Sequence, residues 1–107
     1  MVIIISTTKF PLSKGKEVAE RYIEVSKKYP LDKSLEKQIL PLAVRIRGND
    51  AESISISEVK EGKLEEVLKR ATEQQLLYMD IEGIKFKVDT FFSGVEALPM
   101  IGFKMPE

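Results

Sequence analysis

The chain contains neither cysteine nor histidine among its 107 residues. Without cysteine it can form no disulfide, no thiolate nucleophile and no cysteine metal site. Without histidine it lacks the commonest general base near neutral pH, the commonest zinc ligand and the usual haem ligand. Its 17 lysines and arginines balance 17 aspartates and glutamates, so it has no basic excess of the kind that nucleic-acid binders carry. We therefore expect no cofactor, no metal site and no nucleic-acid partner.

The length of the chain is typical of one domain, which we expect to cover residues 1–107. The apolar stretch from Val2 to Ile5 is too short to span a membrane, and it follows neither a basic leader nor a cleavage site. We therefore expect a cytoplasmic protein without a membrane partner. Asn49 is the only asparagine, whereas lysine and glutamate are abundant, a composition that favours a thermophilic source.

Hydrophobic periodicity predicts the element order β-α-β-β-α-β. Strands are expected over residues 2–10, 40–47, 53–57 and 84–90. One helix is expected between Ser13 and Pro30 and a second between Gly62 and Asp80, with a polar connector over residues 31–38. The turn at Gly48-Asn49-Asp50 predicts that the second and third strands form an antiparallel hairpin. Together these elements predict an α+β fold with two helices on one face of an antiparallel sheet.

Side-chain alternation predicts which face of each strand is buried. The first strand is apolar on both faces, as expected of a strand inside a sheet that is covered on each side. The second and third strands each show one apolar face, which we expect to meet the helices: Leu40, Leu42, Val44 and Ile46 on the second, Ile54 and Ile56 on the third. The opposite face would then receive Arg45, Arg47, Ser53, Ser55, Ser57, Lys85 and Lys87.

The C-terminal segment differs from the rest of the chain. Ser93 followed by Glu96 is a capping-box pattern, and Gly102 stands where a helix C-cap belongs. We therefore predict a short helix from about Gly94 to Ile101. Its apolar side chains are too many for a free tail: Leu98, Met100, Ile101, Phe103 and Met105. Residues 93–107 are therefore expected to pack on the domain or on a second chain.

Three runs carry a resemblance to a known family: residues 54–66 (ISISEVKEGKLEE), residues 78–86 (YMDIEGIKF) and residues 96–102 (EALPMIG). With the element order, the first two resemble the dimeric α/β-barrel superfamily, and the third resembles an uncharacterised, archaeal-type branch of it. The resemblance implies a ferredoxin-like fold and a homodimer, or a higher homo-oligomer, built by stacking two sheets. The superfamily includes cofactor-free monooxygenases that form quinones, lactone isomerases, haem-dependent peroxidase-like enzymes and ligand-sensing domains. None of its catalytic motifs is matched here, so the resemblance assigns no catalytic residue.

Six side chains are candidates for binding a ligand: Tyr22, Arg45, Leu68, Gln75, Tyr78 and Phe86. Gln75 is polar on an apolar helical stripe, and beside Tyr78 it would orient a small aromatic molecule in a pocket lined by Leu68 and Phe86. Arg45 would bind a carboxylate or phosphate. Ordinary structural roles remain open for each: a glutamine that reaches solvent, core tyrosines with hydroxyls at the rim, and an ion-paired arginine.

These observations predict a small dimeric protein that binds an apolar or aromatic molecule in the cleft between helices and sheet. Whether it is a cofactor-independent enzyme or a binding protein stays open. The alternative is an oligomerisation or interaction module whose main product is its own assembly. RNA-recognition domains share this topology but place aromatic residues on their central strands, and residues 3–6 and 54–57 contain none.

Overall fold

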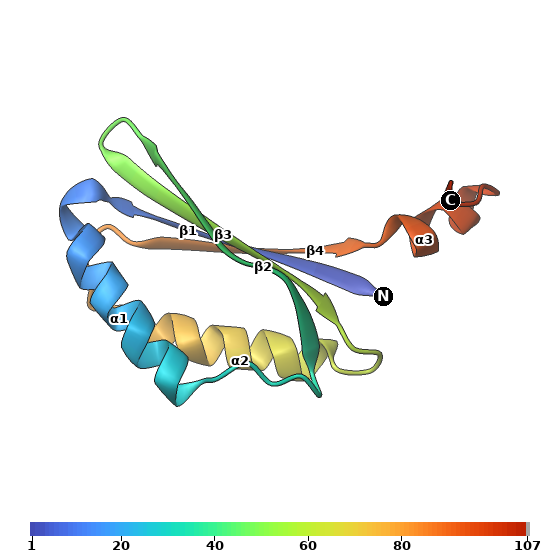
Figure 1. Ribbon diagram of the computed structural model, residues 1–107, viewed down its shortest axis with the longest axis horizontal. Helices are drawn as coiled ribbons and strands as arrows, with labels where there is room; N and C mark the ends of the chain where they lie inside the picture. The colour runs from blue at the N-terminus through green and yellow to red at the C-terminus, as the bar shows by residue number, and fades with distance from the viewer. Residues whose placement is uncertain (107) are drawn as a thin grey trace.

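The computed structural model describes residues 1–106 and shows an α+β domain with an open, four-stranded antiparallel sheet and three helices (Figure 1). The elements follow in the order β1 (Val2–Pro11), η1 (Leu12–Lys14), α1 (Gly15–Lys28), β2 (Glu36–Arg47), β3 (Asp50–Val59), α2 (Leu64–Leu76), β4 (Lys85–Phe92), α3 (Gly94–Ala97) and η2 (Leu98–Ile101), where η denotes a 3-10 turn. The predicted succession of four strands and two long helices is confirmed. Within residues 1–106, no helix has both the length and the apolar character needed to cross a membrane.

The strands lie in the order β2-β3-β1-β4, and all neighbours are antiparallel. The predicted hairpin of β2 and β3 is present, with Gly48 supplying a positive φ of 62° in its turn. Both α1 and α2 lie on the same side of the sheet (Figure 1). The sheet therefore has one face toward the helices and one bare face.

Strand β2 begins at Glu36, four residues before the predicted start, and part of the predicted polar connector is therefore strand. Glu36 is paired with Val59 at the end of β3, and the amide of Lys60 donates to the carbonyl of Leu35. This pairing with β3 keeps the first residues of β2 extended, although their polar sequence alone does not predict a strand. The prediction placed the boundary by hydrophobic alternation, which starts only at Leu40.

Strand β2 also contains two irregularities, between Gln38 and Leu40 and between Leu40 and Ala43. Such bulges change which face a side chain occupies. Leu40 is opposite Ile56, whereas Val44 is opposite Ser53. The prediction that Leu40 shares a face with Leu42, Val44 and Ile46 is therefore wrong, because the bulges separate Leu40 from the other three.

The serines of β3 face the helices, which corrects the prediction that they lie on the bare face. Ser57 is paired with Ile4 of β1, a residue only 4 % exposed in the core beneath the helices. Paired residues on neighbouring strands share a face, so Ser53, Ser55 and Ser57 all lie on the helix side. Ile54 and Ile56 accordingly lie on the bare face, opposite the predicted side.

The core under the helices consists of two clusters. One contains Phe10, Val18, Val25, Ala51, Tyr78 and Ile81, and the other contains Ile4, Leu35, Val59 and Val67. The bare face carries partly exposed apolar side chains that belong to neither cluster, among them Ile3, Ile5, Leu40, Ile54 and Ile56. The first strand is therefore apolar on both faces, but only its helix-side residues are covered within the chain.

The predicted helix over residues 94–101 is confirmed as α3 followed by the 3-10 turn η2, and Gly102 ends it in the left-handed conformation. Residues 93–106, called the C-terminal arm below, project beyond the end of the sheet (Figure 1). The arm is tied to the N-terminus, because the amide of Ser93 donates to the carbonyl of Met1 and Glu96 pairs with the terminal ammonium. Its apolar side chains stay exposed, as in Ile101 at 70 %. The predicted packing of the arm on its own domain is thus absent, and packing on a second chain stays a prediction.

An ion pair holds α1 next to the residues that follow α2. Arg21 of α1 donates from Nη1 and Nη2 to the carboxylate of Asp80, at 2.6 Å and 3.0 Å, and also donates to the carbonyl of Leu77. These hydrogen bonds stabilise the charged forms, so they lower the pKa of Asp80 below 3.8 and raise that of Arg21. The pair connects α1 to the segment that follows α2.

The pH dependence of stability should report this ion pair. Because the folded-state pKa of Asp80 is depressed, its contribution is present above pH 3.8 and is lost as the pH falls through the folded value. In Asp80→Asn, the free energy of unfolding should therefore decline less steeply below pH 3.8 than in the wild type. Urea unfolding at a series of acidic pH values measures this slope. Glu82→Gln, which removes a nearby carboxylate that has no ion pair within residues 1–106, is the control and should keep the wild-type slope.

Candidate functional site

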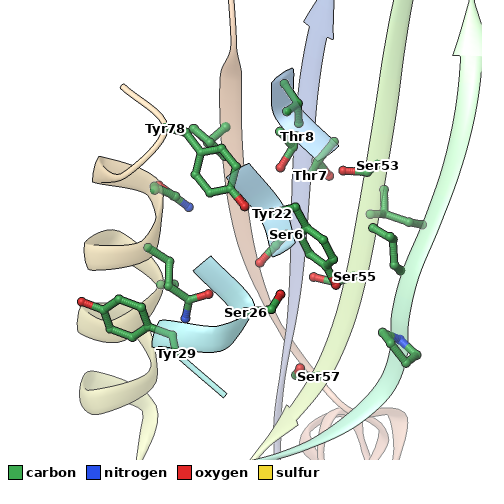
Figure 2. Close-up of a pocket in the computed structure, with 18 of the residues that line it drawn as sticks. Ser6, Thr7, Thr8, Tyr22, Ser26, Tyr29, Ser53, Ser55, Ser57 and Tyr78 are labelled. Atoms are coloured by element: carbon green, nitrogen blue, oxygen red, sulfur yellow. The ribbon is translucent and has the colours of Figure 1, made fainter. Parts of the chain in front are cut away.

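A cleft of about 670 Å³ lies between the two long helices and the sheet. Its volume falls in the range of sites that hold small molecules. Figure 2 shows it with side chains entering from the helices on one side and from β1 and β3 on the other. The cleft has a floor on the sheet, a roof on the helices and an open mouth along β2.

The floor is made of hydroxyl groups: Ser6 and Thr8 on β1, with Ser53, Ser55 and Ser57 on β3. We call these five residues the hydroxyl floor. Ser6 is directly opposite Ser55, and Thr8 is directly opposite Ser53. The floor is therefore a regular grid in which neighbouring hydroxyls share a strand or a cross-strand pair (Figure 2).

Among residues 1–106, only one hydroxyl of this floor is engaged by another side chain. Ser57 donates to Oε1 of Glu36 at 3.2 Å. The other four make no side-chain hydrogen bond within residues 1–106, and no side-chain nitrogen or oxygen in that range is both buried and unpartnered. The four free hydroxyls are therefore reached from the cleft itself.

The roof is built from one face of each helix. Tyr22 and Ser26 come from α1, Ala71 and Gln75 come from α2, and Tyr78 follows α2. These positions recur at helical spacing, so one face of each helix lines the cleft. Figure 2 shows the rings of Tyr22 and Tyr78 in the space between helices and sheet.

Tyr78 is the most enclosed polar group of the roof. It is 8 % exposed, and its ring packs edge-on against Phe86 of β4, with centroids 5.5 Å apart at 66°. Burial, with a smaller effect from Tyr22 and an opposing effect from Arg21, raises the pKa of Tyr78 to about 12. Its phenol therefore stays neutral near pH 7, where it can donate a hydrogen bond but cannot serve as a phenolate base.

The charged groups that border the cleft have partners within the protein. Arg70 donates to the carbonyl of Pro30 and stands over the ring of Tyr29, 5.5 Å from its centroid. The Tyr29 hydroxyl donates to Oε2 of Glu73 at 3.1 Å, and burial of the phenol, followed by that hydrogen bond, raises the pKa of Tyr29. Asp32 accepts from the amide of Ser34 at 2.9 Å and from its hydroxyl, and these bonds lower the pKa of Asp32.

The mouth is apolar. Leu42, Val44 and Ile46 of β2 line the cleft, yet they are 44 %, 60 % and 66 % exposed. They are exposed because α1 and α2 leave this edge strand uncovered (Figure 1). A molecule that enters the cleft would cover this apolar edge first and would then meet the hydroxyl floor.

The structure brings four of the six predicted ligand-binding side chains to the cleft: Tyr22, Gln75, Tyr78 and Phe86. Leu68 packs instead beside Ile4 and Val67 in the second core cluster. Arg45 lies on the bare face, where its Nε donates to Oε1 of Glu52 at 2.8 Å. The binding roles of these residues stay predictions.

Sequence reasoning missed the hydroxyl floor. A signal for it was present, because Ser6 and Thr8 lie between Ile4 and Phe10 on the same face of β1. Antiparallel pairing with β1 then places the serines of β3 on the same side. Within residues 1–106, no group of three acidic, histidine or cysteine side chains is arranged to hold a metal ion.

Comparison with known proteins supports the fold alone. No protein-family model matches the chain, and no curated protein matches its sequence. A solved structure, the de novo designed protein Foldit4, is similar with a TM-score of 0.52 at 16 % identity, over 86 % of this chain and 97 % of the designed one. At this identity the likeness concerns the arrangement of strands and helices and carries no function.

Proposed function

We propose that the cleft binds a small, uncharged, largely apolar or aromatic molecule. The observation that carries this proposal is the 670 Å³ cleft, which combines an apolar mouth, aromatic rings in the roof and hydroxyls in the floor. An ordinary core would fill this layer with interlocking apolar side chains. Here small serines and threonines occupy the central floor positions instead, and they leave space.

We propose that the cleft binds its ligand without supplying a catalytic acid or base, so that any reaction would depend on the reactivity of the ligand itself. The side chains around the floor are hydroxyls, amides and neutral phenols, such as Ser55, Gln75 and Tyr78. Such groups orient a ligand by hydrogen bonds and do not exchange protons readily near pH 7. A cofactor-independent reaction would use the same side chains to hold its substrate.

We further propose that the domain is a ferredoxin-like member of the dimeric α/β-barrel type, and that a second copy covers the bare face. The strand order β2-β3-β1-β4 and both long helices on one side support the fold. The apolar side chains of the bare face, including Ile5 and Ile56, support the dimer. Charges of both signs lie on the same face, such as Lys9, Glu52 and Asp89, so opposite charges could meet across a two-fold axis.

A second candidate function is assembly itself, and the exposed C-terminal arm favours it. Strands of eight to twelve residues give the bare face a projected area of roughly 600 Å². A stable interface needs about 800 Å² from each partner. Apolar arm residues such as Met100, Ile101 and Phe103 would enlarge the buried area if the arm packed on the second copy.

Filling the cleft with Ala71→Trp should abolish ligand binding. An indole at this position of the roof would occupy the space above the hydroxyl floor. With 2-naphthol as the probe, the melting temperature of the wild type should rise with concentration, on the order of 10 °C at a hundredfold excess over Kd. The Ala71→Trp protein should melt at a temperature that 2-naphthol leaves unchanged.

Leu76→Trp is the matched control, because Leu76 is in the same helix and 56 % exposed. It should respond to 2-naphthol as the wild type does. An equal response in Ala71→Trp would place the binding site elsewhere, and the proposal for the cleft would then be wrong.

A further inference from the structure

We propose that the ligand of the cleft is an uncharged ring compound with at least two hydroxyl or carbonyl groups on one edge, and that this edge lies on the hydroxyl floor. The inference rests on the proposed binding function and narrows its ligand class. A purely apolar molecule and an anion are the two classes that it excludes.

The first argument concerns the unpartnered hydroxyls. Ser6, Thr8, Ser53 and Ser55 face the cleft without a side-chain partner within residues 1–106. While the cleft holds water, water can satisfy them. A ligand that displaces this water without hydrogen-bonding groups of its own leaves the hydroxyls buried and unpaired, which is unfavourable. The ligand that binds best therefore carries matching polar groups.

The second argument concerns charge. The cation nearest the cleft, Arg70, is held by the carbonyl of Pro30 and the ring of Tyr29. The carboxylate of Glu36, at the edge of the floor, already accepts a hydrogen bond from Ser57. An anion on the floor would therefore lose its hydration with no cation among the floor residues, and it would lie near the carboxylate of Glu36. An uncharged ligand would suffer neither this loss of hydration nor repulsion by the carboxylate.

The third argument concerns shape. Paired positions on neighbouring strands are about 5 Å apart, and alternate positions along one strand are about 7 Å apart. The free hydroxyls of Ser6, Thr8, Ser53 and Ser55 therefore form a grid whose cells are about the size of an aromatic ring. A rigid ring compound with polar groups at two separated positions can meet two hydroxyls together, while its face contacts Tyr22 of the roof.

Three matched probes test the inference by isothermal titration calorimetry with the full chain. They are 2,7-dihydroxynaphthalene, naphthalene and 7-hydroxy-2-naphthoate, which share a ring system and differ in edge groups and charge. The diol should bind about fivefold more tightly than naphthalene for each hydrogen bond gained. The naphthoate should bind more weakly than the diol. Equal affinity of diol and naphthalene, or tightest binding of the naphthoate, would overturn the inference.

Ser55→Ala identifies the floor as the origin of the preference. The change removes one hydroxyl and keeps the size of the side chain nearly constant, so the fold should survive. It should lower the affinity for the diol about fivefold, and the affinity for naphthalene should stay the same or rise. Ser13→Ala, at an exposed position outside the cleft, should change neither affinity. An unchanged preference in Ser55→Ala would overturn the role of the floor.

The outcomes separate this inference from the proposed function. If naphthalene binds wild type but not Ala71→Trp, and the diol binds no better, the cleft is a binding site and only the ligand class is wrong. If none of the three probes binds, the proposed function is wrong as well.

Discussion

Replacing Ile56 with aspartate is expected to convert the proposed dimer into a monomer. Ile56 lies at the centre of the bare face, opposite Ile5 of β1 and Leu40 of β2. In a two-fold dimer the substitution would bury two unpaired carboxylates, one from each copy. Such a buried, unpaired charge costs several kcal/mol, so the dimer Kd should rise on the order of a thousandfold or more. Sedimentation velocity across a concentration series measures this change.

Ile46→Asp is the matched control for the position of the interface. Ile46 is also an isoleucine in a strand, 66 % exposed, but it faces the cleft side of β2. This variant should remain dimeric. Deleting residues 93–107 should weaken the proposed dimer less than Ile56→Asp, because in that dimer the arm would only add to an interface that the sheet would provide. A wild-type protein that sediments as a monomer at all concentrations would contradict the proposed assembly.

Gly83→Ala is expected to destabilise the domain by about 3 kcal/mol. Gly83 has a φ of +83°, and a Cβ there would lie 2.7 Å from Cγ and 3.0 Å from Cδ of Pro11. The left-handed backbone costs a non-glycine residue about 1 kcal/mol. The clash adds about 2 kcal/mol, because the proline ring is stiff and has little room to move. Urea unfolding followed by circular dichroism measures the loss.

Gly62→Ala separates the two contributions. Gly62 has a similar φ of +75°, but no atom lies within 4 Å of the position of its Cβ. This variant should lose only the backbone part, about 1 kcal/mol. Adding Pro11→Ala to Gly83→Ala should recover part of the extra loss, as expected for two residues in direct contact. Equal losses in Gly83→Ala and Gly62→Ala would show that the contact with Pro11 has no energetic weight.

The helices and the overall succession of strands could be predicted because their signals are local. The stripe containing Val18, Tyr22 and Val25 has helical spacing, and α1 buries Val18 and Val25 as that spacing requires. Pro30 and Gly48 mark the end of a helix and a hairpin turn by their own backbone preferences. Such features depend on neighbours in the sequence and not on distant partners.

Which side chains of β3 point toward the helices could not be predicted from the residues of β3 alone. Isoleucine and serine alternate regularly there, and the usual rule places isoleucine inward. That rule assumes one buried and one solvated face, but here the bare face is apolar as well. Only the pairing of Ser57 with Ile4 decides between the two faces, and this is information about a partner strand.

In the candidate site, too, the residues on helices could be predicted, whereas those whose position depends on strand pairing could not. Tyr22, Gln75 and Tyr78 could be assigned to the cleft because they follow helical stripes. Arg45 was assigned by alternation on β2, and its observed partner Glu52 is on the neighbouring strand. The hydroxyl floor required the pairing of β1 with β3, so it emerged only with the sheet assembled.

The bulged segment of β2 has a consequence for how this chain tolerates change in length. Leu40 serves the bare face, and Leu42, two positions later, serves the mouth of the cleft. In a regular strand, residues two apart share a face. Inserting or deleting one residue between Gln38 and Ala43 would move the strand residues on one side of the change to the opposite face, unless the bulges rearranged. The spacing of this edge strand should thus be under stricter evolutionary constraint than the identity of its side chains.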